Sequence, residues 1–238
     1  MKADAVIFDK DGTLLDFDAF WVGVSENAIE DTLKWAKDDV TDALDVLEAF
    51  GVHNGVTDIE GALCKGTYDE LADIMYAVMK KNGYTGEREG IARVLKASFK
   101  GNTDSGEIKP TAENLADVLA ELKRRNKKLA VVTTDNAEIT LKCLKGLGID
   151  RYFDKIYTDD GIIPTKPDPF CVNDFCTFAG IEKDGVVMVG DTMTDMNFAK
   201  NAGIRVIGIA KSEGNRALLA SCADAVINDP SQLFEILE

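Results

Sequence analysis

Residues 5–13 of the chain read AVIFDKDGT, and this stretch decides the fold class. Four apolar residues, from Ala5 to Phe8, come without interruption before an acidic turn that contains Gly12. A short apolar run that ends in turn residues is typical of a strand buried on both faces, as in a parallel sheet covered by helices. We therefore expect the first strand here, with polar side chains directly after it.

The same arrangement recurs beyond Pro110, where apolar runs alternate with segments of helical periodicity. The runs expected to be strands are 129–132, 155–157, 186–189, 205–209 and 225–227. The segments expected to be helices are 112–126, 137–145, 169–179, 193–201 and 215–221, with Thr111 as the N-cap of the first. Strands that alternate with helices form βα units, so the sequence predicts an α/β fold with a Rossmann-like parallel sheet as its core.

The segment between these two regions has a different pattern. Helical spacing extends over 19–37, 41–50, 67–81 and 87–100, with glycines between the segments and few β-branched runs. We expect an inserted α-helical domain at residues 16–101, and a core domain formed by residues 1–15 and 102–238.

Composition excludes several classes of protein. Of 238 residues, 45% are apolar and 29% are charged, as in an ordinary globular chain. The net charge of −15 disfavours nucleic acid and anionic membranes as partners. Five scattered cysteines and one histidine argue against a disulfide framework and a zinc site. The apolar run before Asp9 is too short for a signal peptide and no stretch is long enough to span a membrane, so we expect a cytoplasmic protein.

Acidic residues follow two of the expected strands. Asp9 and Asp11 follow the first strand, and Asp191 and Asp195 follow the strand at 186–189. Because ligands of open α/β sheets bind at the carboxyl ends of the strands, these carboxylates are candidate ligands of Mg²⁺. Taken alone, an Asp-x-Asp-Gly sequence is equally well explained as a simple turn.

Four motifs in order resemble those of the haloacid dehalogenase (HAD) superfamily. The first is the segment Val6–Leu14, the second is Val131–Thr133, the third is Lys166–Pro169, and the fourth is Val187–Asp191 with Asp195. The resemblance implies a HAD-fold core and an enzyme that transfers a phosphoryl group through an aspartyl-phosphate. The carboxylate at Asp11, which dehalogenases lack, indicates phosphate-ester chemistry.

The resemblance also implies a role for each motif residue. Asp9 would be the nucleophile, and Asp11 would be the general acid and then the general base. Lys166 would neutralise negative charge at the reacting group. Thr133 would bind a phosphate oxygen, and Thr134 is a further candidate for substrate binding.

The implied cofactor is Mg²⁺, with Asp9, Asp191 and the main-chain carbonyl of Asp11 as ligands. For Asp195 three interpretations stay open. It holds the ion through water, it forms a salt bridge with Lys166, or it only occupies the first turn of a helix, where acids are favoured.

The position of the helical insertion matches the C1 cap of this superfamily. Lys65, in a turn between two expected cap helices, is a candidate contact for the substrate, and an exposed loop lysine is the alternative. The closest resemblance is to phosphoglycolate phosphatases, which implies a phosphoric monoester hydrolase acting on a small phosphorylated metabolite. A sugar-phosphate mutase of the β-phosphoglucomutase type is the alternative, and a non-enzymatic binding module would require all four motifs to be accidental.

Overall fold

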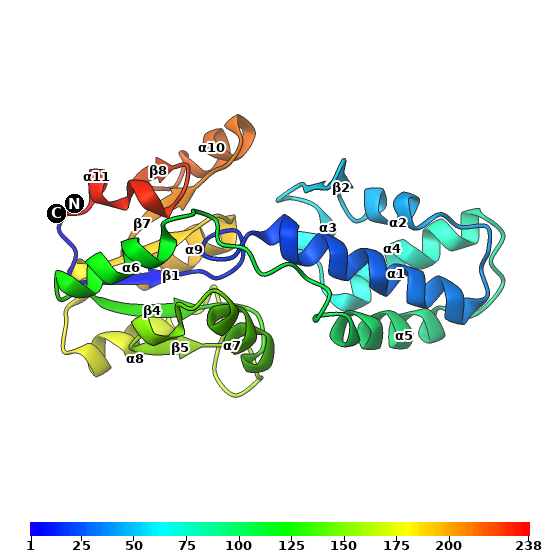
Figure 1. Cartoon of the computed structure of the whole chain (residues 1–238), viewed down its shortest axis with the longest axis horizontal. Coiled ribbons are helices and arrows are strands. Elements are labelled where there is room, and N and C mark those ends of the chain that lie inside the picture. Colours follow the sequence, from blue (N-terminus) through cyan, green and yellow to red (C-terminus); the bar gives the residue numbers. More distant parts are fainter. The chain divides into compact units, whose positions relative to one another are not determined.

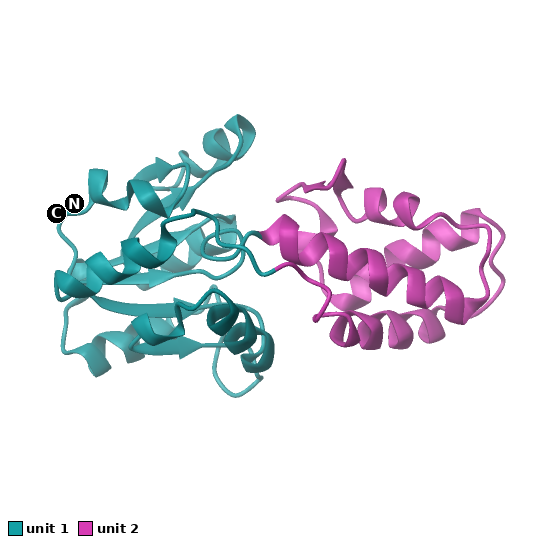
Figure 2. Ribbon diagram, in the orientation of Figure 1, with its two compact units in different colours: residues 1–16, 108–238 teal, residues 17–107 magenta.

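The computed structural model of the chain describes residues 1–238 and divides them into two compact units, shown in different colours in Figure 2. The core unit is Met1–Asp16 with Ile108–Glu238, and the helical unit is Phe17–Glu107. The segment after residue 101 stays with the helical unit, where the backbone N–H of Glu107 donates to the carbonyl of Ala19 at 3.1 Å.

A six-stranded sheet forms the centre of the core unit (Figure 1), and all of its strands are parallel. Their order is β5-β4-β1-β6-β7-β8, so the first strand of the chain lies in the interior of the sheet. The strands are β1 (Ala5–Phe8), β4 (Lys128–Val132), β5 (Lys155–Tyr157), β6 (Val186–Gly190), β7 (Arg205–Ile209) and β8 (Ala225–Ile227). The predicted α/β fold with a parallel sheet is confirmed.

Helices cover both faces of this sheet, which explains why β1 is apolar at every position. Val6 and Phe8 pack into one hydrophobic cluster and Ala5 and Ile7 into the other, because successive side chains of a strand point to opposite faces. The helices on the first face are α6 (Leu115–Arg124), α7 (Ala137–Gly146) and α11 (Leu233–Ile236). Those on the second face are α8 (Phe170–Ala179), α9 (Met193–Ala202) and α10 (Glu213–Leu219).

One prediction about the core unit is wrong. Thr111 does not cap a helix that starts at residue 112, since α6 begins at Leu115. Instead, the Thr111 hydroxyl donates to the carbonyl of Thr13 at 2.5 Å, and its backbone N–H donates to that of Leu14 at 3.1 Å. These bonds join the segment before α6 to the loop after β1.

The helical unit contains the four long helical segments that the sequence predicts. They correspond to a π-helical turn at Asp18–Val22 followed by α1 (Gly23–Ala36), and to α2 (Ala43–Ala49), α4 (Tyr68–Lys81) and α5 (Arg88–Gly101). Periodicity did not reveal three shorter elements, the hairpin strands β2 (Val52–His53) and β3 (Val56–Thr57) and the single helical turn α3 (Ala62–Lys65).

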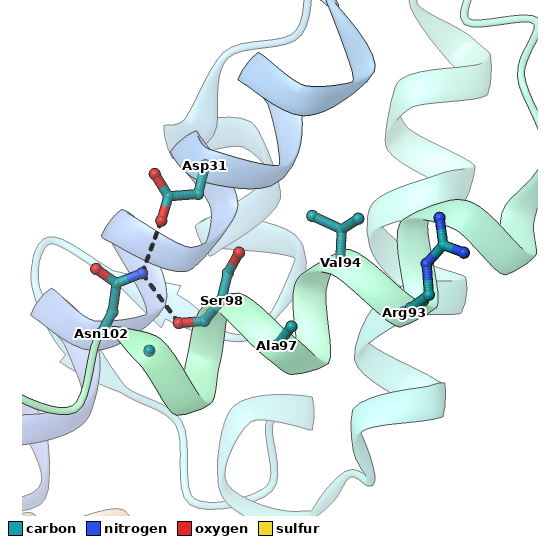
Figure 3. Close-up of a pocket in the computed structure, with 7 residues that line it drawn as sticks. Asp31, Arg93, Val94, Ala97, Ser98 and Asn102 are labelled. Atoms are coloured by element: carbon teal, nitrogen blue, oxygen red, sulfur yellow. Dashed lines mark hydrogen bonds between the residues drawn. The ribbon is translucent and has the colours of Figure 1, made fainter.

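A shallow depression of about 530 Å³ lies along α1 and α5 of the helical unit (Figure 3). Asn102 and Asp31 point toward each other there, and the Asn102 amide donates to the Asp31 carboxylate and to the Ser98 carbonyl, both at 2.9 Å. None of the motif residues lines this depression. No helix in the structure is both long enough and apolar enough to cross a membrane.

Candidate active site

The pairing of β1 with β6 brings the first and fourth motifs together. Phe8 is in register with Val189, and the backbone N–H of Asp9 donates to the Val189 carbonyl at 2.9 Å. Asp9 therefore leaves the sheet beside the loop that carries Asp191 and Asp195. Carboxylate oxygens of these three residues, called the carboxylate cluster below, all lie within 4.8 Å of one another.

Lys166 connects two members of the carboxylate cluster. Its ammonium donates to Asp9 Oδ1 at 2.5 Å and to Asp195 Oδ1 at 2.7 Å, and its side chain is buried. Burial alone would lower the pKa of Lys166, but the two neighbouring carboxylates outweigh burial and raise it. Lys166 is therefore a fixed positive charge at the carboxyl end of β1.

Asp195 is held by both of its carboxylate oxygens. Oδ1 accepts from Lys166, while Oδ2 accepts from the Thr192 hydroxyl at 2.7 Å and from the Thr192 backbone N–H at 3.0 Å. The contacts with Thr192 form a capping box at the start of α9. A Cβ added at Gly190 would lie 2.4 Å from the Asp195 Cγ, so only glycine leaves room for this carboxylate. Of the three interpretations of Asp195, the structure contains the salt bridge with Lys166, and it also places Asp195 in the first turn of α9.

Asp191 is oriented by the loop that follows β1. The Thr13 hydroxyl donates to Asp191 Oδ1 at 3.1 Å. Gly12 adopts a left-handed conformation with φ +73°, and a Cβ there would lie 2.0 Å from Asp191 Oδ2. The glycine of the first motif therefore supplies both a backbone conformation and the space that the Asp191 carboxylate occupies.

The carboxylate cluster contains more negative charge than Lys166 compensates. Burial, together with the charges of Asp195 and Asp11, raises the pKa of Asp9 to about 7, although Lys166 acts in the opposite direction. Desolvation and the charges of Asp9 and Asp195 raise the pKa of Asp191 well above its usual value. Three carboxylates face one ammonium, and all the free donor atoms are oxygens. This donor set fits a hard divalent cation such as Mg²⁺.

Asp11 lies outside the carboxylate cluster, in a second group of charges. The Lys10 ammonium lies 2.6 Å from both oxygens of Asp11 and 2.9 Å from Asp135 Oδ2. Burial opposes the charged form of Lys10, but Asp11 and Asp135 raise its pKa above the usual value. The pKa of Asp135 is raised to about 6, mainly by desolvation, with Lys10 opposing that shift. We call these three residues the Lys10 cluster.

The remaining candidate residues differ in their surroundings. Thr133 is buried at the end of β4, and its hydroxyl oxygen accepts from the backbone N–H of Asp135 at 3.2 Å. Thr134, the next residue, is exposed. Lys65 lies in α3 of the helical unit, where its half-exposed side chain forms an ion pair with Glu60.

Sequence reasoning assigned no role to four residues that contact the predicted ones, namely Lys10, Gly12, Thr13 and Asp135. Gly12 and Thr13 carry a recognisable signal, because they sit next to the paired aspartates in the first motif. For Lys10 and Asp135 the signal is weaker, since it is only their position in the polar segments that follow expected strands. A lysine between two aspartates suggests an exposed turn, whereas the Lys10 side chain is completely buried.

Comparison with known proteins shows which family this chain belongs to. Residues 6–209 match the family model described as haloacid dehalogenase-like hydrolase. The chain is 33% identical over 125 residues to the pyrophosphatase PpaX of Bacillus velezensis, covering 52% of this chain and 58% of that protein. It is 26% identical over 226 residues to phosphoglycolate phosphatase 1 of Pseudomonas aeruginosa, covering 94% of this chain and 75% of that protein.

The matched segment thus spans little more than half of PpaX. Among solved structures, the chain is similar to magnesium-bound YfnB of Bacillus subtilis, with a TM-score of 0.71, 18% identity and 99% coverage of each chain. This likeness concerns the fold. The family match covers all four motifs and extends over most of the sheet, which confirms the resemblance found in the sequence. The chain belongs to the haloacid dehalogenase-like hydrolase family.

Proposed function

We propose that this chain is a Mg²⁺-dependent phosphoric monoester hydrolase that acts on a small phosphorylated metabolite. The observation that carries the proposal is the carboxylate cluster at the carboxyl ends of β1 and β6, with Lys166 between Asp9 and Asp195. A similarity to phosphoglycolate phosphatase 1 over 94% of the chain supports the same class of reaction.

Asp9, Asp191 and the main-chain carbonyl of Asp11 would hold the metal ion. Both oxygens of Asp195 already accept hydrogen bonds, so we assign this residue to holding Lys166. The bound ion would neutralise the excess negative charge of the carboxylate cluster and withdraw charge from the phosphoryl oxygens.

In the first step, an Asp9 carboxylate oxygen attacks phosphorus while the bond between phosphorus and the leaving oxygen breaks. Asp11 gives a proton to that leaving oxygen. Lys166 stabilises the negative charge on the transferring group from a fixed position. The Thr133 hydroxyl oxygen accepts from the Asp135 N–H, which leaves its hydrogen to donate to a phosphoryl oxygen.

In the second step, water attacks phosphorus and the bond to Asp9 breaks, which releases inorganic phosphate and restores the carboxylate. Asp11 accepts the proton of the attacking water, which replaces the proton that it gave to the leaving oxygen in the first step. A carboxylate nucleophile suits this sequence because its acyl-phosphate is readily hydrolysed.

The helical unit and the proteins that are similar to this chain both indicate a class of substrate. We propose that the helical unit is a C1 cap that excludes water from the site, with Lys65 and Thr134 contacting the substrate. A cap of this kind favours small molecules, and 2-phosphoglycolate is the leading candidate because a phosphoglycolate phosphatase matches most of the chain. Pyrophosphate belongs in the same panel because PpaX is a pyrophosphatase.

A panel of phosphorylated metabolites tests this function by release of inorganic phosphate with Mg²⁺ and with EDTA. We expect Mg²⁺-dependent release, fastest with 2-phosphoglycolate, and no turnover by Asp9→Asn. Absence of any Mg²⁺-dependent turnover would refute the phosphatase assignment. Interconversion of sugar phosphates without net release of phosphate would instead identify a mutase.

A further inference from the structure

The Lys10 cluster is the second group of buried charge in the core unit, and the proposed reaction so far uses only its Asp11. We propose that Lys10, anchored by Asp135, is a positioning residue that orients the Asp11 carboxylate for proton transfer to the leaving oxygen. This inference rests on the proposed function, since it assumes that Asp11 acts on a phosphate ester.

Burial is the first observation that supports this role. The Lys10 side chain has no exposed surface. An ammonium group withdrawn from water loses its hydration, so it is retained only where charged partners compensate. A long apolar side chain would fill the same space without this cost. A charged side chain at this buried position is therefore explained by the carboxylates of Asp11 and Asp135, with which it pairs.

The second observation is the geometry of the contact with Asp11. The ammonium lies 2.6 Å from each of the two Asp11 oxygens, so it fixes the rotation of the carboxylate as well as its distance. The Asp11 side chain itself is only 18% exposed. Asp11 lies near enough to the nucleophile to contribute to the raised pKa of Asp9. Lys10 thus orients a carboxylate whose charge acts on the proposed nucleophile.

Asp135 supplies the anchor from a different strand. Asp135 follows β4, its backbone N–H donates to the Thr133 hydroxyl, and its backbone carbonyl accepts from the Asp159 N–H at 2.8 Å. Its Oδ2 is buried, lies 2.9 Å from the Lys10 ammonium and accepts no hydrogen bond of good geometry. Asp135 therefore holds the Lys10 ammonium from the end of β4, while Lys10 holds Asp11.

Leaving-group dependence separates this role from a merely structural one. Dinitrophenolate leaves without being protonated, whereas an alkyl alkoxide needs a well-placed acid. We therefore compare 2,4-dinitrophenyl phosphate with an alkyl phosphate in the presence of Mg²⁺. For Lys10→Met we expect kcat on the alkyl phosphate to fall about 10²-fold, as for a 1 Å misplacement, with KM within about twofold of wild type. On dinitrophenyl phosphate we expect a loss of less than about threefold.

Two further variants keep the test decisive. Asp135→Asn, which keeps the size of the side chain and removes its charge, should show the same selectivity with a smaller loss of about tenfold on the alkyl phosphate. Lys155→Met removes a lysine of β5 that pairs with Asp174 of α8, outside the site, and should leave both rates unchanged. An equal loss on both esters, or no loss, in Asp135→Asn or in folded Lys10→Met overturns the inference. Failure of wild type to hydrolyse either ester would refute the proposed function instead.

Discussion

The tight approach of Gly12 to Asp191 gives a prediction whose magnitude follows from the structure. In Gly12→Ala, the new Cβ would lie 2.0 Å from Asp191 Oδ2, whereas Cβ contacts below 3.0 Å are essentially not observed. The carboxylate must therefore retreat by at least about 1 Å. A displacement of this size in a catalytic group reduces the rate by about 10²-fold. We expect that loss in kcat/KM, together with at least a tenfold rise in the Mg²⁺ concentration for half-saturation.

The same substitution also places alanine in the left-handed region, where it costs about 1–2 kcal/mol. Gly148→Ala is the matched control, because Gly148 has φ +69° and no atom within 4 Å of the added Cβ. Both variants should lose the stability that the left-handed conformation costs, about 2–4 °C in Tm for each kcal/mol in a chain of this size, and Gly12→Ala should lose more because of its clash with Asp191. Only Gly12→Ala should also lose activity.

Steady-state kinetics across a Mg²⁺ titration, together with thermal unfolding of both variants, make up the assay. A Gly12→Ala enzyme with kcat/KM within threefold of Gly148→Ala would refute the reasoning. It would mean that the Asp191 carboxylate moves without consequence, and that the close approach to Gly12 does not define the metal site.

Three other predictions concern stability, metal binding and thiol chemistry. Asp154 accepts from Lys123 Nζ at 2.6 Å and from the Leu129 N–H at 2.8 Å, and these bonds outweigh its partial burial and lower its pKa. Asp154→Asn should therefore lose about 1–2 kcal/mol at pH 7 in urea unfolding. That deficit should vanish as the pH falls from about 3.9, the pKa of an aspartate in the unfolded chain, through the lower pKa of Asp154 in the folded protein. A deficit that persists at pH 2 would contradict the assignment. Mg²⁺ at 100 times its Kd should stabilise the fold by about 2.7 kcal/mol, seen as a higher Tm than in EDTA; equal Tm values would argue against a metal site in the folded chain. Burial raises the pKa of Cys143 to about 11, so a thiol reagent at pH 8 should modify the exposed Cys222 first and Cys143 only after unfolding, as peptide mass mapping would detect.

Local sequence was enough to predict the sheet and its helices. Continuous apolar runs such as Ala5–Phe8 leave a strand no polar face, so helices must cover both sides of it. The position of Thr111 was misjudged for a related reason. A hydroxyl before an apolar segment fits the pattern of an N-cap, but in the folded chain the Thr111 backbone pairs with Leu14 of a distant segment, and the helix starts only at Leu115.

The grouping of the site residues was only partly accessible from the sequence. Asp9, Lys166, Asp191 and Asp195 were chosen because they follow strands or fit a family motif, and the structure brings all four together. Periodicity contains no information about which oxygen of Asp195 binds which donor. That assignment depends on the capping box of α9 and on the loop that delivers Lys166, which meet only when the sheet is assembled.

The sequence by itself therefore determined the alternation of buried strands with helices. It also determined the chemical types of the groups at the strand ends. Both features depend on residues that are adjacent along the chain. Tertiary structure alone decided that Lys10 is buried between Asp11 and Asp135 and that Gly12 faces Asp191. The contacts of Lys10 with Asp135 and of Gly12 with Asp191 join segments that are more than a hundred residues apart in the chain. Their energies depend on distance and desolvation in the folded protein, and neither quantity exists until β1, β4 and β6 lie side by side.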